Sequence, residues 1–175
     1  MIEIIAVIFS LLSVILSARN NIWGWPVGII GVLAYFFIFE QNRDWNNMTL
    51  QIIFLIQSIY GWFVWKRGSS TKIGTIKNPL DLSLVFVLLT PFLYFISIGF
   101  NGNSSLLDSV TTCLSIMGMV LLAHKKIENW VIWTIADFLY IGLFIEDKLY
   151  LSAGLYFIFL LVAIWGFIDW KKQIA

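Results

Sequence analysis

The sequence predicts an all-α membrane protein whose seven transmembrane helices form two parallel three-helix bundles joined by one connecting helix. Three observations lead to this fold class. Of the 175 residues, 60% are hydrophobic and 12% are charged, which is more apolar surface than a soluble domain of this length can bury. Apolar runs of membrane-crossing length recur along the whole chain. One tryptophan-ended pattern also occurs twice, with an apolar segment between the two copies.

Seven apolar runs come close to the roughly 20 residues that a membrane-spanning helix needs. Short polar stretches, such as 19–21 and 124–126, separate them. The first run opens Met1-Ile2-Glu3 without the basic segment of a cleaved signal peptide, so we expect it to be a retained helix. The predicted spans are 2–18, 22–40, 48–66, 82–100, 105–123, 127–146 and 149–170.

The repeat divides the chain into two halves. Residues 60–67 (YGWFVWKR) return at a constant offset as residues 165–172 (WGFIDWKK). Four predicted helices, an even number, separate equivalent elements, so both halves share one orientation about an axis along the membrane normal. Upstream of the two copies, the sequence pairs Asn21, Trp23 and Trp25 with Asn129, Trp130 and Trp133. The predicted units are a first bundle over 1–66, a flexible cytoplasmic linker over 67–81, a connecting helix over 82–100 and a second bundle over 105–175.

Basic residues are distributed unequally between the two sides of the predicted bundle. Seven spans place alternate loops on opposite sides, and nine of the eleven Lys and Arg residues then fall on one side. The positive-inside rule assigns that side to the cytoplasm, with the N-terminus outside and the C-terminus inside. The nine residues are Arg19, Lys66, Arg67, Lys72, Lys77, Lys125, Lys126, Lys171 and Lys172.

Composition and motifs argue against several classes of function. The net charge of +1 provides no basic face for nucleic acid, and the single cysteine, Cys113, permits neither an internal disulfide nor a multi-thiolate metal site. No G-x-S-x-G or H-E-x-x-H motif occurs, and the one histidine, His124, stands among lysines. Lysine is found only at the ends of the last span, which argues against a retinal Schiff base. We therefore expect neither an enzyme nor a cofactor-binding protein.

The segment 127–146 carries the strongest candidate for a binding site. Trp130, Trp133, Asp137 and Tyr140 recur at spacings of three, four and three, which places them on one helix face. Asp137 falls near the middle of the span, where a carboxylate costs roughly 2.5–3.5 kcal/mol on insertion scales. Aromatic rings beside a carboxylate attract a small aromatic cation. The alternative is packing, with Asp137 in a hydrogen-bonded helix contact and Trp130 as an interfacial anchor.

Polar residues of other spans are candidates for the same site. Gln51 and Gln57 lie in segment 48–66, and intramembrane amides seldom face lipid because an unpaired amide costs several kcal/mol there. Each glutamine is open between a ligand contact and a hydrogen bond between helices. Tyr60 and Tyr156 are weaker candidates, since such residues more often pack. A further group follows helical spacing and forms a polar stripe descending from the outer side: Asp108, Thr111, Thr112 and Ser115.

Several short motifs, found together, resemble the PnuC family of vitamin transporters. They span essentially the whole chain and comprise Trp25-Pro26, Tyr60-Gly61-Trp62, Trp130-x-x-Trp133, Lys148-Leu149-Tyr150 and Gly166-x-x-x-Trp170. The resemblance implies a seven-helix core similar to the SWEET sugar transporters, assembled as a homotrimer in the bacterial inner membrane. It also implies that Trp130, Trp133 and Asp137 belong to the binding region, and that a cytoplasmic vitamin kinase traps the imported product.

The pocket and the resemblance together predict an alternating-access facilitator for a small cationic vitamin precursor, with nicotinamide riboside favoured. Thiamine also carries a positively charged aromatic ring and stays an alternative, whereas riboflavin, without a fixed cation, fits less well. Proton coupling would use a chain of acidic residues or histidines, and only Asp108 and Asp137 clearly qualify, so uniport is the simpler expectation. A non-transporting scaffold protein also stays open.

Overall fold

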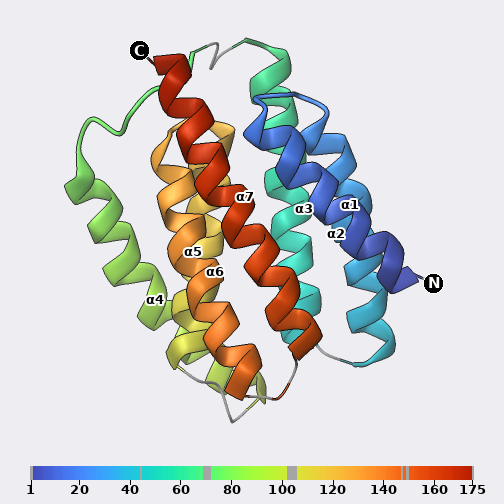
Figure 1. The fold of residues 1–175 in the computed structure, drawn as a ribbon. Coiled ribbons are helices and arrows are strands. Elements are labelled where there is room, and N and C mark those ends of the chain that lie inside the picture. Colours follow the sequence, from blue (N-terminus) through green and yellow to red (C-terminus); the bar gives the residue numbers. More distant parts are fainter. Residues whose placement is uncertain are drawn as a thin grey trace.

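The computed structural model consists of seven α-helices that lie side by side (Figure 1). It describes residues 2–43, 45–68, 72–101, 106–146, 148 and 150–174. The predicted all-helical fold is confirmed, and six of the helices are long and apolar enough to cross a membrane, while the first, with 17 residues, is shorter. The helices are α1 (Ile2–Ala18), α2 (Gly24–Gln41), α3 (Trp45–Lys66), α4 (Pro79–Asn101), α5 (Leu106–Ala123), α6 (Glu128–Glu146) and α7 (Tyr150–Ile174).

The helix bounds agree with the predicted spans to within a few residues. The largest differences are at α3, which begins at Trp45 instead of 48, at α4, which begins at Pro79 instead of 82, and at α7, which continues beyond 170 to Ile174. Proline suits the first position of a helix, because its fixed φ is helical and its missing N–H would have no partner there. The additional turn of α7 is polar, so a search for apolar runs does not include it.

Two turns end their helices in the same way. Asn20 after α1 and Lys125 after α5 have φ values of 54° and 51°, in the left-handed region. In both turns the N–H of the next residue bonds to the carbonyl five positions back, at 2.9 Å, which is the usual closure of a helix C-terminus. Asn20 and Lys125 are 105 residues apart, as are Tyr60 and Trp165, so the repeat extends to these turns.

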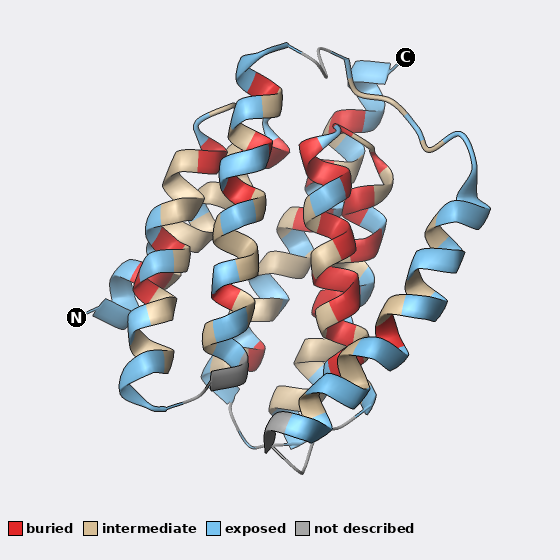
Figure 2. Cartoon of the chain, turned by 180° about the vertical axis from the view of Figure 1, so that it is seen from behind, coloured by how far each residue is buried: buried red, intermediate tan, exposed pale blue. Residues whose placement is uncertain are grey.

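Six helices pack in a closed order. α1 packs against α2, α2 against α3, α3 against α5, α5 against α6, α6 against α7, and α7 against α1 again. α4 lies outside this order, beside α5 and with slight contact to α3 (Figure 1). Figure 2 shows that α5 carries many of the buried residues, whereas α4 is mostly exposed. An exposed apolar helix of this kind suits a lipid environment.

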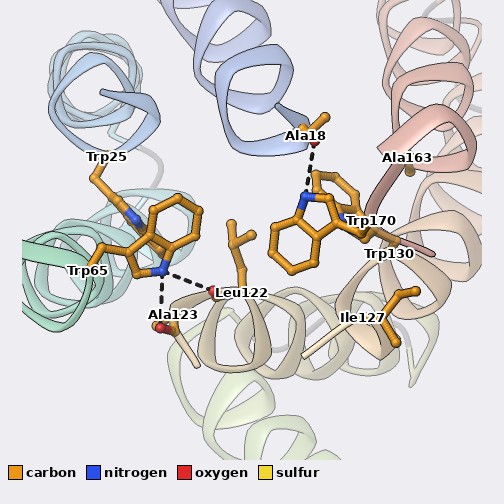
Figure 3. Packing of buried hydrophobic residues seen from close by; sticks show 9 residues of the cluster. All are labelled: Ala18, Trp25, Trp65, Leu122, Ala123, Ile127, Trp130, Ala163 and Trp170. Carbon is orange, nitrogen blue, oxygen red and sulfur yellow. Dashed lines mark hydrogen bonds between the residues drawn. The ribbon is translucent and has the colours of Figure 1, made fainter. Parts of the chain in front are cut away.

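Two tryptophan pairs repeat one geometry near the ends of α1 and α5 (Figure 3). The ring centroids of Trp25 and Trp65 are 5.6 Å apart with an interplanar angle of 84°, and those of Trp130 and Trp170 are 5.4 Å apart with an angle of 88°. Each pair therefore has the edge-to-face arrangement that aromatic rings favour.

A glycine lies against one tryptophan of each pair. A Cβ atom placed on Gly61 would overlap the Trp25 ring, and one placed on Gly166 would lie 2.8 Å from Trp130 ring atoms. The two glycines are again 105 residues apart. Both tryptophan pairs therefore depend on the absence of a side chain at the same position of the repeat.

These contacts correct the upstream pairing expected from the sequence. Trp25 and Trp130 share the 105-residue offset and are equivalent, whereas the equivalent of Trp133 is Gly28. Trp23, which the sequence had placed in the repeat, is 64% exposed. The pairing expected from the sequence matched tryptophans by their order along the chain, whereas the contacts in the structure match residues that are 105 positions apart.

The segment between α3 and α4 is docked over its described residues, 72–78, which we call the strap. The sequence predicted a flexible linker here and did not predict the contacts that these residues make. Gly74 forms a β-bridge with the α5–α6 turn: its N–H donates to the Lys125 carbonyl and its carbonyl accepts from the Ile127 N–H, both at 3.0 Å. Composition could not reveal this, because backbone atoms make the bonds. Residues 69–71 of the expected linker lie outside the described residues.

Candidate functional site

The carboxyl of Asp137 is the centre of the candidate site. It lies at the midpoint of α6, nine residues from Glu128 and nine from Glu146, and the residue is 2% exposed. A carboxyl near the middle of a membrane-spanning helix costs free energy, so such residues usually face the interior of a bundle and have a function there. The groups beside Asp137 therefore decide what the site can bind.

Three aromatic side chains form a cluster next to Asp137. The ring centroids of Tyr140 and Tyr156, from α6 and α7, are 4.7 Å apart. Phe144 lies 6.1 Å from Tyr140 and 5.1 Å from Tyr156. The carboxyl of Asp137 is close enough to both tyrosine hydroxyls to interact with them electrostatically. Aromatic rings and a carboxyl, the two components that attract a cationic ring, therefore occur together.

Helix α5 contributes hydroxyl groups to the same cluster. Thr111 and Ser115 are buried, and their side chains lie close enough to the Tyr140 hydroxyl to interact with it. Thr111 also donates to the carbonyls of Leu107 and Asp108 at 3.0 Å, and Ser115 donates to the Thr111 carbonyl at 2.9 Å. Because both hydroxyl protons bond within the helix, the oxygens present acceptor sites to a phenol or to a ligand hydroxyl.

The other two residues of the predicted polar stripe lie differently. Asp108 is exposed in the first turn of α5 and acts on Tyr140 through its charge. Thr112 is half-buried, and among the described residues no hydrogen bond joins its hydroxyl to the cluster. Neighbouring positions on a helix point roughly 100° apart, so Thr112 does not share the side of Thr111.

The two tryptophans of α6 occupy different surroundings. Trp133 lies one turn from Asp137 and packs on Gly118 of α5, where a Cβ atom would be 2.9 Å from the indole nitrogen. Trp130 lies two turns from Asp137, is 1% exposed and packs against Trp170. Trp133 therefore lies one helical turn from the carboxyl, whereas Trp130 belongs to the tryptophan pair near the helix end.

The two glutamines of α3 also differ. The amide nitrogen of Gln57 donates to the Ile116 carbonyl of α5 at 3.1 Å, so this side chain joins two helices. Its oxygen is buried without a hydrogen-bond partner among the described residues. Gln51 is buried in α3 and is the equivalent, at the 105-residue offset, of Tyr156.

Tyr156 is the residue that sequence reasoning undervalued. Its contacts with Tyr140 and Phe144 place it in the aromatic cluster, although the sequence alone favoured packing. The repeat held the missing signal, because it aligns Tyr156 with Gln51, which was already a candidate. Tyr156 also lies within electrostatic reach of Tyr35 on α2, which is the repeat equivalent of Tyr140. The cluster therefore includes groups from both halves of the chain.

The resulting site combines one carboxyl with phenol rings, hydroxyl acceptors and an indole. In the described part of the chain, no group of three or more His, Cys, Asp or Glu side chains could hold a metal ion. These components suit noncovalent binding of a small, flat, positively charged molecule that also carries hydroxyl groups.

The chain matches proteins of known family over almost its whole length. The family model described as nicotinamide mononucleotide transporter matches residues 1–172. The chain is 27% identical over 201 residues to the nicotinamide riboside transporter PnuC of Escherichia coli (strain K12), an alignment that covers 97% of this chain and 84% of that protein. It is 22% identical over 182 residues to the riboflavin/roseoflavin transporter RibM of Streptomyces davaonensis, with 96% and 83% covered.

A solved structure has the same fold. The crystal structure of the vitamin B3 transporter PnuC aligns with a TM-score of 0.82 at 20% identity, over 99% of this chain and 81% of that chain. The resemblance seen in the short motifs is thereby confirmed by the family match over residues 1–172. The chain belongs to the nicotinamide mononucleotide transporter family of membrane proteins.

Proposed function

We propose that this protein takes up nicotinamide riboside across a bacterial inner membrane. The observation that carries the proposal is the carboxyl of Asp137, buried at the midpoint of a membrane-spanning helix beside Tyr140 and Tyr156. The name of the Escherichia coli relative, a nicotinamide riboside transporter, supports the choice of ligand.

Nicotinamide riboside fits the site by charge and by shape. Its pyridinium ring has a fixed positive charge, which Asp137 neutralises while the rings of Tyr140 and Tyr156 offer their π faces. An ion pair buried away from water is favourable only when further hydrogen bonds compensate both partners for the water that they lose. The ribose hydroxyls donate to the acceptor oxygens of Thr111 and Ser115.

Two other vitamins are weighed by the same charge argument. Thiamine is the second candidate, because its thiazolium ring also has a positive charge for Asp137. Riboflavin, which the name of the Streptomyces relative mentions, has no fixed cation to pair with that carboxyl. The order we propose is therefore nicotinamide riboside, thiamine and then riboflavin.

The proposed mechanism is uniport by alternating access between two three-helix units, α1–α3 and α5–α7, with α4 as their connector. The equal geometry of the two tryptophan pairs supports this division. Nine of the eleven basic residues fall on one side of the predicted bundle. This asymmetry supports a cytoplasmic location for the C-terminal end of α7 and an outer location for the start of α1. A kinase in the cytoplasm would trap the imported vitamin, and the protein would assemble as a homotrimer.

Binding to purified protein tests the proposed ligand. We expect Asp137→Asn to weaken nicotinamide riboside binding by about 100-fold, because the buried cation loses its counter-charge. Asp81→Asn, which replaces an exposed carboxylate at the start of α4, serves as the matched control and leaves affinity unchanged. Calorimetric titration with all three vitamins measures the order. Wild-type affinity in Asp137→Asn, or tightest binding of riboflavin, would contradict the proposal.

Uptake into proteoliposomes tests the proposed mechanism. A uniporter needs only the gradient of its substrate, so radiolabelled nicotinamide riboside enters at the same rate with or without a pH gradient. A rate that collapses when the pH gradient is removed would show proton coupling and refute uniport.

A further inference from the structure

We propose that the two helix contacts joining α1–α3 to α5–α7 have different roles at the end of the molecule where the tryptophan pairs lie. The α3–α5 contact is a hinge that stays closed, whereas the α1–α7 contact is the gate that opens. This inference rests on the proposed transport function, because only a transporter needs to open one end of the molecule.

The two contacts share one construction. The indole nitrogen of Trp170 on α7 donates to the Ala18 carbonyl, the last residue of α1, at 3.0 Å. The indole nitrogen of Trp65 on α3 donates to the Ala123 carbonyl, the last residue of α5, at 3.1 Å, and to the Leu122 carbonyl at 3.3 Å. Figure 3 shows these bonds, one at each of the two tryptophan pairs. Each unit therefore supplies the tryptophan that closes a helix end of the other unit.

A second pair of contacts follows the same repeat. The Tyr60 hydroxyl lies 3.2 Å from a ring nitrogen of His124, between α3 and the end of α5. At the equivalent positions, the Arg19 guanidinium lies 5.7 Å from the centre of the Trp165 ring, between the end of α1 and α7. Because the two contacts share these interactions, a difference in their strength must come from other residues.

The α3–α5 contact has two side-chain interactions that the α1–α7 contact cannot form. The Lys125 ammonium lies 4.3 Å from the centre of the Trp65 ring, while the equivalent residue, Asn20, is uncharged and donates to the Gln173 side chain at 3.3 Å. Gln57 of α3 bonds to α5 at 3.1 Å, and its equivalent in α7 is Val162, which has no polar group. The α3–α5 contact is therefore the more strongly held.

The strap adds backbone connections to the α3–α5 contact alone. Besides the two Gly74 bonds, the Ile76 N–H donates to the Glu128 carboxylate at 2.9 Å and the Lys126 ammonium donates to the Thr75 carbonyl at 3.0 Å. These bonds fix the strap to the α5–α6 turn, on the side of the molecule where α3 meets α5. Among the described residues, the backbone–backbone bonds of the α1–α2 turn are all local, so no segment like the strap bonds to the backbone of that turn.

An unfilled groove separates the strap from α7. It has a volume of about 470 Å³ and is lined by Thr75, Ile127 and Glu128 on one side and by Phe167, Lys171 and Ile174 of α7 on the other. The end of α7 can therefore shift without breaking a strap bond. The interactions of Gln57 and Lys125 resist separation of α3 from α5, while α1 and α7 can part at lower cost, as expected of a hinge and a gate.

Reversible cross-linking of two matched pairs tests this assignment. In a Cys113→Ala background, one variant has Asn20→Cys with Gln173→Cys across the α1–α7 contact, and the other has Thr75→Cys with Lys126→Cys between the strap and the α5–α6 turn. A hydrogen bond joins the original residues of each pair, at 3.3 Å and 3.0 Å, so one short bis-methanethiosulfonate reagent can span both.

We expect cross-linking of the 20–173 pair to reduce nicotinamide riboside uptake by about tenfold or more, with recovery after reduction. The cross-linked 75–126 pair keeps its uptake rate within about twofold, because the strap stays docked throughout the cycle. Full uptake with the 20–173 pair cross-linked, or loss of uptake with the 75–126 pair cross-linked, would overturn the inference.

Failure of the proposed function gives a distinguishable result, because neither the wild-type protein nor the unlinked variants would then take up nicotinamide riboside. Spin labels at the same two pairs test the gate and the hinge without any substrate. The expected distance distribution has two populations for the 20–173 pair and one narrow population for the 75–126 pair. One narrow population for both pairs, or two for the strap pair, would overturn the inference.

Discussion

The two halves of the chain match at the helix ends where the tryptophans lie and differ in the middle of the helices. At the ends, the pairs Trp25–Trp65 and Trp130–Trp170 have nearly the same distance and angle. In the middle, the 105-residue offset aligns Asp137 with Val32, Trp133 with Gly28 and Thr111 with Ala6. The repeated tryptophan positions therefore hold the helices together, whereas the carboxyl that we propose as the counter-charge of the ligand occupies a position that is not repeated.

One stacked pair of rings in the middle of the helices is shared by the two halves. Tyr35 and Phe39 stack with centroids 5.9 Å apart at 18°, and their equivalents Tyr140 and Phe144 stack 6.1 Å apart at 18°. The second stack has the carboxyl of Asp137 one turn away on the same helix, where the first half has Val32. The charge that acts on Tyr35 comes instead from Glu3 of α1.

The largest expected effect comes from replacing Asp137 of the second half with valine, the residue at the equivalent position 32 of the first half. Asp137→Val should weaken nicotinamide riboside binding by about 100-fold or more, because the cation would be buried without a counter-charge. The same change should leave the melting temperature equal or higher, since it removes a costly buried carboxyl. Calorimetric titration and thermal unfolding in detergent measure the two quantities. A fall in the melting temperature together with the loss of affinity would mean that Asp137 is a packing residue.

The next effect concerns a repeated position. Gly61→Ala should lower the free energy of unfolding by about 1–3 kcal/mol, because the added methyl group overlaps the Trp25 ring inside a packed region. Gly166→Ala should cost less, since its Cβ would lie 2.8 Å from Trp130 ring atoms. Gly142→Ala is the matched control: its Cβ meets no atom within 4 Å, and alanine favours the helix. Equal stability of all three variants in denaturant unfolding would argue against this packing.

A smaller effect distinguishes the two crossed hydrogen bonds. Trp170→Phe removes one donor to the Ala18 carbonyl and should cost about 1 kcal/mol of stability. Trp65→Phe removes a donor shared by two carbonyls and also weakens the Lys125 contact, so it should cost more. Unfolding in detergent compares the two variants directly. A larger loss for Trp170→Phe would contradict the view that the α3–α5 contact is the stronger one.

The smallest effect is a pH dependence at the α5–α6 turn. Burial lowers the pKa of the Lys125 ammonium from its ordinary value of 10.5. Between the lowered pKa and 10.5, the unfolded chain binds a proton that the folded chain does not, so stability rises with pH in this window and falls as the pH drops through the folded pKa. Lys125→Gln should reduce this slope in thermal unfolding measured at alkaline pH. An identical slope in both proteins would contradict the assignment.

The length of the apolar runs was sufficient to predict the helices, because each run is bounded by polar residues that lie at the turns. The predicted start of α4 missed Pro79, since the first turn of that helix is polar on one side. The docking of the strap was out of reach, because Gly74 bonds through its backbone and no side-chain pattern records such a bond.

The candidate site was predicted in part. Spacing placed Asp137 and Tyr140 correctly on one side of a helix, and the structure adds the contact of Tyr140 with Thr111 and Ser115. Spacing within one helix could not show that Trp130 packs against α7, nor that Tyr156 joins the aromatic cluster. Both depend on contacts between distant segments, which only the repeat register hinted at.

The two crossed tryptophan bonds also become possible at different times while the chain is synthesised. Trp65 leaves the ribosome 58 residues before its acceptor at Ala123, so the end of α5 meets its partner as soon as it is made. Ala18 must wait for Trp170, which follows 152 residues later. The carbonyl at the end of α1 therefore lacks its indole donor until α7 has been made, so α7 completes the end of α1.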